Sequence, residues 1–274
     1  MKTKRSLFHR FAAFPYWVWS AMFIIAPLIV VIYFAFTDSN GAFTFNNIAN
    51  LASYWQTFAM SLSFSLIATT VCLLIGYPLA YCMSKMSEKS RNILLVLLML
   101  PMWISLLIRT YSLMTLLDNG GLISTLLQSI GLPPLTFIGT DAAVILGMIY
   151  DFLPYMVLPI YTSLVKIDKR YIEASADLGG NSFTTLRKVI LPLTKPGIIS
   201  GITMVFVPSI STFYISQKLG GGSFDLIGDT IERQFQNQVT YNTGAAISLV
   251  MMILILASLA IMNKFTDGEE EIIV

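Results

Sequence analysis

Charged residues are scarce in this sequence. Only 12% of its 274 residues are Asp, Glu, Lys or Arg, whereas 55% are hydrophobic. In a soluble domain roughly a quarter of the residues are charged, and a soluble chain of this length could bury one large core with far less apolar sequence. The formal net charge is only +2, which gives no indication of nucleic-acid binding. This composition predicts an integral membrane protein.

Residues that carry chemistry are equally rare. The only histidine is His9, and the two cysteines, Cys72 and Cys82, fall on one predicted helix about 15 Å apart along its axis, too far to bridge. No Gly-x-Ser-x-Gly, His-Glu-x-x-His or Walker loop occurs. An intramembrane protease would need a histidine or paired acids within the bilayer, and neither is found. We therefore expect no catalytic residues, no metal site and no cofactor.

Long apolar runs are what the sequence does have. The first, residues 17–36, is about 20 residues long and spans a hydrocarbon core of about 30 Å. This length exceeds that of a signal-peptide core, so we expect an uncleaved span. The predicted organisation is an N-terminal segment 1–16, a membrane domain 17–263 and a tail 264–274. The six expected spans cover residues 17–36, 60–84, 93–117, 142–164, 197–216 and 244–263.

Basic residues divide unevenly between the segments that connect these spans. The two ends, the 84–92 loop and the 165–196 loop together hold 14 Lys and Arg, whereas the other loops hold two. Lys and Arg concentrate on the cytoplasmic side of membrane proteins. The asymmetry therefore predicts that both termini and the 165–196 loop are cytoplasmic.

The longest polar interval lies within that loop. A short helix is expected from Lys169 to Leu178, with Asp168 as its N-cap and Gly179-Gly180 at its C-terminus. A second helix is expected from Ser182 to about Ile190, ended by Pro192. Because a short helix between two spans has no domain of its own to pack against, either the lipid surface or another protein should cover it.

Two charges fall within predicted spans. Asp151 lies roughly 13 Å deep and Arg109 roughly 24 Å along its helix, near the outer interface. Arginine can extend to the headgroups, but an aspartate stem is too short. Asp151 should therefore face a cavity or the bundle interior, pair with Arg109 or a partner chain, or be protonated. Its neighbours Tyr150, Pro154 and Tyr155 favour a cavity.

The fifth span and the loop after it are rich in polar groups. Ser211 and Tyr214, just beyond Pro208, suit either a solute path or helix packing, and residues 226–235 predict a short outer helix. Three acids, Asp225, Asp229 and Glu232, belong to the predicted outer face. They either follow from the exclusion of basic residues there or favour a cationic solute.

One long motif indicates a family. Glu173-Ala174-Ser175, three residues, Gly179, nine residues and Val189-Ile190-Leu191-Pro192 resemble the EAA loop of ABC importer permeases, with Ser175 and Val189 as small departures. In that family the loop is a coupling helix that docks on a cytoplasmic ATPase. The resemblance implies ATPase-coupling roles for Tyr171, Ile172, Glu173, Ala174, Ser175, Asp177, Leu178 and Gly179.

Softer similarity extends over most of the chain. Segments such as 76–80, 107–111, 153–161 and 219–235 resemble the B-type permease subunit of spermidine/putrescine transporters. The resemblance implies an all-α type I ABC importer permease of six spans, in a cell membrane. Its implied partners are a second permease, two ATP-binding subunits, an extracellular polyamine-binding protein and the lipid bilayer. The substrate pathway would then include Asp151, Tyr150, Tyr155, Ser211, Tyr214, Arg109 and Trp103.

Two alternatives stay open from sequence. The chain could serve an importer of another small solute, such as iron, thiamine or an anion, or it could form a passive channel. A channel would not need a coupling loop, and Asp151 with the acidic outer face favours a cation over an anion. The sequence leaves open which polyamine is carried.

Overall fold

The computed structural model describes residues 7–270 except 39, 134 and 135. The predicted N-terminal segment and tail therefore lie partly outside the described residues. The described chain is helical, apart from an isolated antiparallel bridge between Thr37 and Phe43. It forms two compact units, one within Met1–Trp55 and Thr230–Leu254, the other within Gln56–Asp229 and Ile255–Val274.

The first unit pairs the beginning of the chain with the start of its last helix. Helices α1 and α2 run on through a π-helical turn η1, and α3 with the 3₁₀ turn η2 follows; α14 begins at Tyr241. Their bounds are α1 Leu7–Ser20, η1 Ala21–Ile25, α2 Ala26–Ala35, α3 Asn46–Ala49, η2 Asn50–Tyr54 and α14 Tyr241–Glu270. Ala35 packs with Ala245 and Ala246 in a small core, because small side chains let two helices approach closely.

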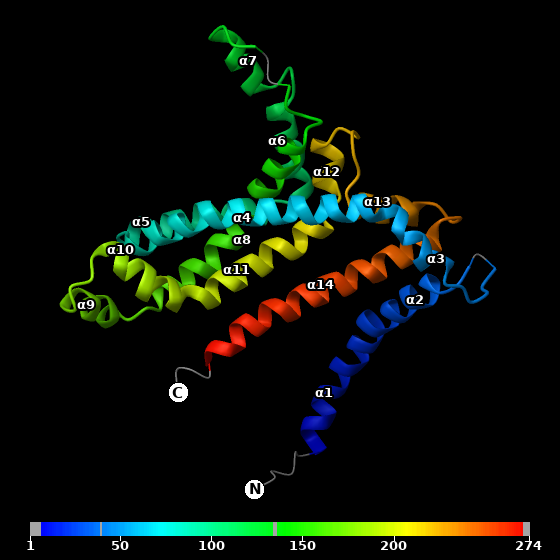
Figure 1. Cartoon of the computed structure of the whole chain (residues 1–274), viewed down its shortest axis with the longest axis horizontal. Coiled ribbons are helices and arrows are strands. Elements are labelled where there is room, and N and C mark those ends of the chain that lie inside the picture. Colours follow the sequence, from blue (N-terminus) through cyan, green and yellow to red (C-terminus); the bar gives the residue numbers. More distant parts are fainter. Residues whose placement is uncertain (1–6, 39, 134–135, 271–274) are drawn as a thin grey trace. The chain divides into compact units, whose positions relative to one another are not determined.

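The second unit holds most of the membrane helices (Figure 1). In chain order its elements are α4 Trp55–Lys85, α5 Glu88–Met99, η3 Leu100–Trp103, α6 Leu106–Leu117, α7 Leu122–Ser129, α8 Asp141–Val165, α9 Lys169–Asp177, α10 Ser182–Thr185, η4 Leu186–Ile190, α11 Leu191–Ser211 and α12 Tyr214–Leu219. Helix α13 (Ile227–Gln236), the expected short outer helix, crosses from this unit into the first.

Helix α8 forms the centre of the second unit. It contributes a run of buried apolar side chains that includes Met148, Met156, Val157 and Ile160. Helix α11 packs along it where Gly201 lies directly against Met156, so that no side chain separates the two backbones. This contact is the small-residue packing that joins helices in lipid, where apolar burial alone gives little drive.

Within the described residues, five helical segments are long and apolar enough to cross a membrane, or six if one bent pair counts as a single span. They overlap all six predicted ranges. The third range, however, is not one straight helix: the segments Glu88–Trp103 and Leu106–Ser129 meet at 97°. The bend follows Pro101, and Ile104 and Ser105 have extended backbone angles that no helix can continue through.

The prediction that Pro192 ends a helix is wrong. The chain stays helical from Ser182 to Ser211, through both Pro192 and Pro196. The π-helical turn η4 ends at Ile190, and Pro192 lies in the turn of α11 that follows it directly. The wider winding of η4 accommodates a residue that has no N–H to donate, so the proline does not end the helix. A helix that changes its winding at η4 therefore connects α10 to α11 without a break.

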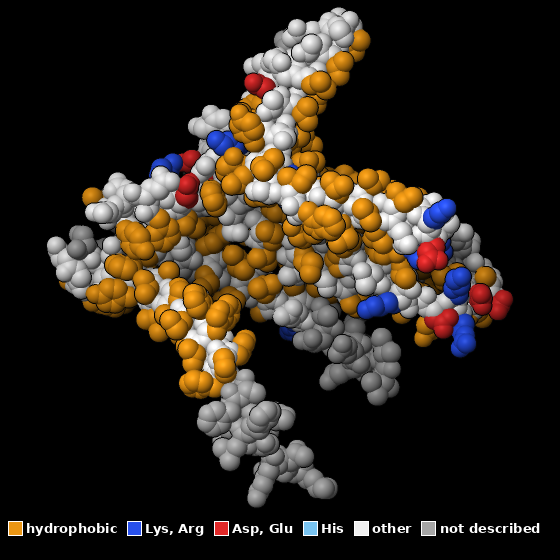
Figure 2. All heavy atoms as spheres, turned by 180° about the vertical axis from the view of Figure 1, so that it is seen from behind, with side chains coloured by type: hydrophobic (Ala, Val, Ile, Leu, Met, Phe, Trp, Pro, Cys, Tyr) orange, Lys and Arg blue, Asp and Glu red, His pale blue; other side chains and the backbone are white. Residues whose placement is uncertain are grey.

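Charged side chains gather at one end of the second unit. Figure 2 shows Lys, Arg, Asp and Glu grouped at the end that carries α9, whereas the flank behind it is covered by apolar side chains. Many of the exposed apolar side chains belong to α4 and α5, such as Leu66, Leu74, Ile93 and Val96. Such a surface is stable only against lipid or another protein.

Candidate functional site

A helical hairpin at the charged end is the first candidate site. Asp168 accepts a hydrogen bond from the Arg170 backbone N–H at 3.0 Å, and Asn181 accepts one from the Thr184 N–H at 2.8 Å, so each side chain caps the helix that follows it. Between the two helices, Gly179 has φ +76°, a left-handed conformation that glycine adopts without strain. The predicted α9 helix with its N-cap and glycine turn is thus confirmed.

Ser175 ties the two arms of this hairpin together. Its hydroxyl lies 2.8 Å from the Thr185 hydroxyl, and its carbonyl accepts the Gly180 N–H at 2.8 Å. Ser175 is also the position that departs from the Glu-Ala-Ala pattern. The serine hydroxyl therefore provides a hydrogen bond between α9 and α10 that an alanine could not form.

The outer side of the hairpin exposes large apolar side chains. Leu178 is 89% exposed, Phe183 69% and Tyr171 58%. A cavity of about 410 Å³ opens between the two arms. It is lined by Tyr171, Ala174, Ser175, Leu178, Gly180, Thr184, Lys188 and Val189. Exposed apolar groups around a hollow on a polar segment are typical of a protein-docking surface.

The structure sorts the predicted coupling residues into two groups. Glu173, Ala174 and Asp177 are exposed with Tyr171 and Leu178, whereas Ile172 and Ser175 are half-buried and hold the hairpin to its surroundings. Sequence reasoning missed Phe183. A large apolar residue between Asn181, Ser182 and two threonines was the signal that could have found it.

A buried ion pair joins α6 to α8. The Arg109 guanidinium lies 3.2 Å from an Asp151 carboxylate oxygen and donates to the Asp151 backbone carbonyl at 3.2 Å. The Thr110 hydroxyl lies 3.0 Å from the other carboxylate oxygen. Asp151 is 0% exposed and Arg109 only 5%. Of the alternatives for Asp151, pairing with Arg109 is thus the one found, and Arg109 does not extend to the headgroups.

The other predicted pathway residues differ in exposure. Trp103 is 80% exposed and Tyr150 43%, Ser211 is exposed, and Tyr155 and Tyr214 are half-buried. Tyr214 carries the Lys218 ammonium over its ring at 5.6 Å. In the described part of the chain, no hydrogen bond or ring contact links any of these residues to Asp151. The structure therefore joins Arg109, Thr110 and Asp151 by polar contacts, whereas among the described residues the aromatic side chains form no such contact with Asp151.

The three outer acids have different surroundings. Asp229 is only 4% exposed, and its carboxylate accepts the Leu226 N–H at 2.8 Å, which caps the start of α13. Asp225 is half-exposed. Glu232, in the first unit, is half-exposed and accepts a hydrogen bond from Gln236 at 2.8 Å. Asp229 is therefore structural in this chain rather than an exposed charge.

Known proteins resemble the chain over nearly its whole length. A relative from Haemophilus influenzae, the spermidine/putrescine transport system permease protein PotB, is 36% identical over 99% of this chain and all of its own. PotB of Escherichia coli is 38% identical over 86% of this chain and 89% of its own. The fold matches a solved bacterial ABC transporter involved in the import of alginate, with a TM-score of 0.76 at 19% identity over 96% of this chain and 97% of that one.

The alginate transporter shares the fold alone at that identity. The all-helical importer permease fold is therefore what this match shows, whereas the role of a membrane permease, and not of an ATPase, rests on the family model and the relatives. A family model described as the binding-protein-dependent transport system inner membrane component matches residues 72–267, which include α8, the α9 hairpin and α11. The chain therefore belongs to the family of inner-membrane permease components of binding-protein-dependent ABC transport systems.

Proposed function

We propose that this permease imports polyamines, with spermidine and putrescine as the substrate class. The observation that carries the proposal is the 36–38% identity to two PotB proteins over most of both chains. Alginate, the cargo of the transporter with the matching fold, is an acidic polysaccharide and a poor guide at 19% identity.

The α9 hairpin is the proposed ATPase-docking element. Tyr171 and Leu178 are exposed and line a cavity that a side chain of the ATPase would fill. Phe183, Glu173 and Asp177 are further exposed side chains of the same hairpin that the ATPase could contact. In the complete transporter we expect a second permease that pairs with this chain in the membrane. Two ATP-binding subunits would dock on the hairpin side, and a polyamine-binding protein would dock on the opposite side. Both termini and the hairpin would then be cytoplasmic.

The proposed pathway is lined by Trp103, Tyr150 and Ser211, with Tyr155 and Tyr214 beside it. Exposed aromatic rings support the proposal, since each offers an ammonium group a cation–π contact of about 0.5–2 kcal/mol. Asp151 is included in the proposed pathway because it is the only acidic residue of α8 beyond the first turn. With its charge paired to Arg109, it would act on a cargo only after that pair opens.

The test is reconstitution of the complete transporter in liposomes with a polyamine-binding protein outside. We expect spermidine or putrescine to stimulate ATP hydrolysis and to accumulate inside, while thiamine, ferric iron and alginate oligosaccharides have no effect. ATP-independent accumulation would instead support a passive channel. Stimulation by another solute alone would overturn the polyamine assignment and leave family membership untouched.

A further inference from the structure

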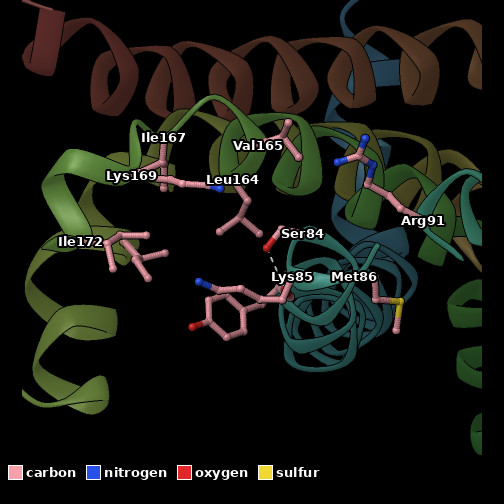
Figure 3. A pocket seen from close by; sticks show the side chains of 11 residues that line it. Ser84, Lys85, Met86, Arg91, Leu164, Val165, Ile167, Lys169 and Ile172 are labelled. Atoms are coloured by element: carbon pink, nitrogen blue, oxygen red, sulfur yellow. Dashed lines mark hydrogen bonds between the residues drawn. The ribbon is translucent and has the colours of Figure 1, made fainter. Parts of the chain in front are cut away.

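A second cavity, of about 370 Å³, lies on the inner side of α9 and shares no lining residue with the hairpin cavity. It opens where α4 and α8 end and α9 begins (Figure 3). Its walls are Tyr81, Ser84, Lys85, Met86, Arg91, Leu164, Val165, Ile167, Lys169, Ile172 and Ile190. Every one of these residues belongs to the second unit.

The charge of this cavity is of one sign. Lys85, Arg91 and Lys169 line it, and no acidic residue does. Figure 3 shows Lys85 and Lys169 extending from opposite walls into the space between α4 and α9, with Arg91 on the Val165 side. Among the described residues, none of the three cations forms an ion pair; the Lys85 ammonium lies only over the Tyr81 ring, at 5.4 Å. Like charges around one hollow repel, so an anion between them would be stabilised.

Apart from Ser84 and the hydroxyl group of Tyr81, the rest of the lining is apolar. Leu164 and Ile190 are buried at 7% and 3% exposure, whereas Val165 and Met86 are 47% and 40% exposed. The cavity thus offers cations and hydrocarbon together, at the ends of helices long and apolar enough to span a membrane. A free phosphate ion would find hydrogen-bonding groups on only part of this wall, whereas a headgroup linked to acyl chains uses both kinds of surface.

We propose that this cavity binds the phosphate headgroup of an anionic phospholipid. Basic pockets between membrane helices are known to suit such headgroups. Lys85 ends α4 and Lys169 begins α9, so one headgroup would bridge a membrane helix and the hairpin. The lipid would offset the repulsion between the two ammonium groups and hold α9 in place. The proposal does not depend on the identity of the cargo.

The test compares two double variants that remove the same charge. Lys85→Gln/Lys169→Gln empties the cavity of both lysines, and Lys89→Gln/Lys166→Gln removes two exposed neighbours that do not line it. Phosphatidylglycerol is titrated onto the purified full-length chain in neutral detergent, and bound lipid is counted by native mass spectrometry. Each cation near a lipid surface contributes about fivefold in affinity, so the first pair should weaken binding about 25-fold and the control pair less than about twofold.

Three further arms keep the result decisive. The variant Lys85→Arg/Lys169→Arg should retain phosphatidylglycerol, which separates loss of charge from loss of folding. Zwitterionic phosphatidylcholine should bind no better to the wild type than to the variant with the two glutamines. Equal weakening by both glutamine pairs would overturn the site, because it would mean diffuse attraction. Displacement of phosphatidylglycerol by millimolar inorganic phosphate, with the same dependence on Lys85 and Lys169, would overturn the lipid assignment in favour of a free phosphate.

Discussion

Asp151→Asn is the substitution with the largest expected effect on stability. It keeps the size of the side chain and an oxygen for the Thr110 hydroxyl, but it removes the charge that faces the Arg109 guanidinium. Arg109 is 5% exposed and its guanidinium cannot lose its proton, so a buried positive charge would remain with only the Asp151 backbone carbonyl as partner.

Removing one partner of a buried ion pair costs about 3–5 kcal/mol. The opposite substitution, Arg109→Met, should cost less, about 1–3 kcal/mol, because a carboxyl group left behind can bind a proton and remain hydrogen-bonded to Thr110. The combination Asp151→Asn/Arg109→Met buries no charge, so it should be more stable than Asp151→Asn alone by about 2 kcal/mol or more.

The measurement is equilibrium unfolding of the purified chain in mixed micelles, followed by helicity, for the wild type and the three variants. Uptake of labelled spermidine by the reconstituted transporter is measured in parallel. A stable, assembled Asp151→Asn variant with poor uptake would mean that Asp151 acts on the cargo. The structural reasoning is refuted if Asp151→Asn unfolds within about 0.5 kcal/mol of the wild type, or if adding Arg109→Met makes it less stable.

Three other sets of substitutions test the remaining assignments. Gly179→Val, forced to positive φ, should cost about 1–3 kcal/mol locally and uncouple ATP hydrolysis from uptake, whereas Gly179→Asn should stay active; equal activity of the two in a coupled ATPase assay would contradict the role of the turn. Ser175→Ala and Thr185→Val should show a coupling free energy of about 0.5–1.5 kcal/mol in a double-mutant cycle of thermal unfolding, and additive losses would mean that their hydroxyl contact contributes nothing. Neutralising Asp225 and Glu232 together should slow uptake most at low ionic strength, because salt screens exposed charges; a loss that salt does not alter would leave only topology to explain these acids.

Sequence reasoning recovered the parts of this protein that depend on local rules. The α9 helix was predictable because Asp168 and Gly179 are capping residues whose effect is confined to one turn. The membrane helices were predictable from the length of the apolar runs, because the thickness of the bilayer sets the length that a spanning helix needs. The short helix α13 followed from apolar spacing alone.

The features that the sequence could not predict depend on residues that are neighbours in space and not only along the chain. Pro192 was expected to end a helix because proline breaks the backbone hydrogen-bond ladder, but the change of winding at Leu186–Ile190 could not be foreseen from composition. The ion pair was one of several alternatives for Asp151, and the sequence could not choose among them because the choice depends on how α6 packs against α8. Arg109, which was expected near the outer interface, is instead buried. Asp229 could not be told from Asp225 by residue type, since only the backbone N–H of Leu226 makes it a cap.

The unbroken run of helix from Ser182 to Ser211 has a mechanical consequence. Thirty residues at about 1.5 Å each make a rod about 45 Å long, with the docking hairpin at one end and Ser211 at the other. If the rod pivots near its docking end, a tilt of about 5° displaces the far end by about 4 Å, roughly three-quarters of a helical turn. A small displacement of the hairpin by an ATPase would therefore cause a larger displacement of the helix beside the residues proposed to line the pathway.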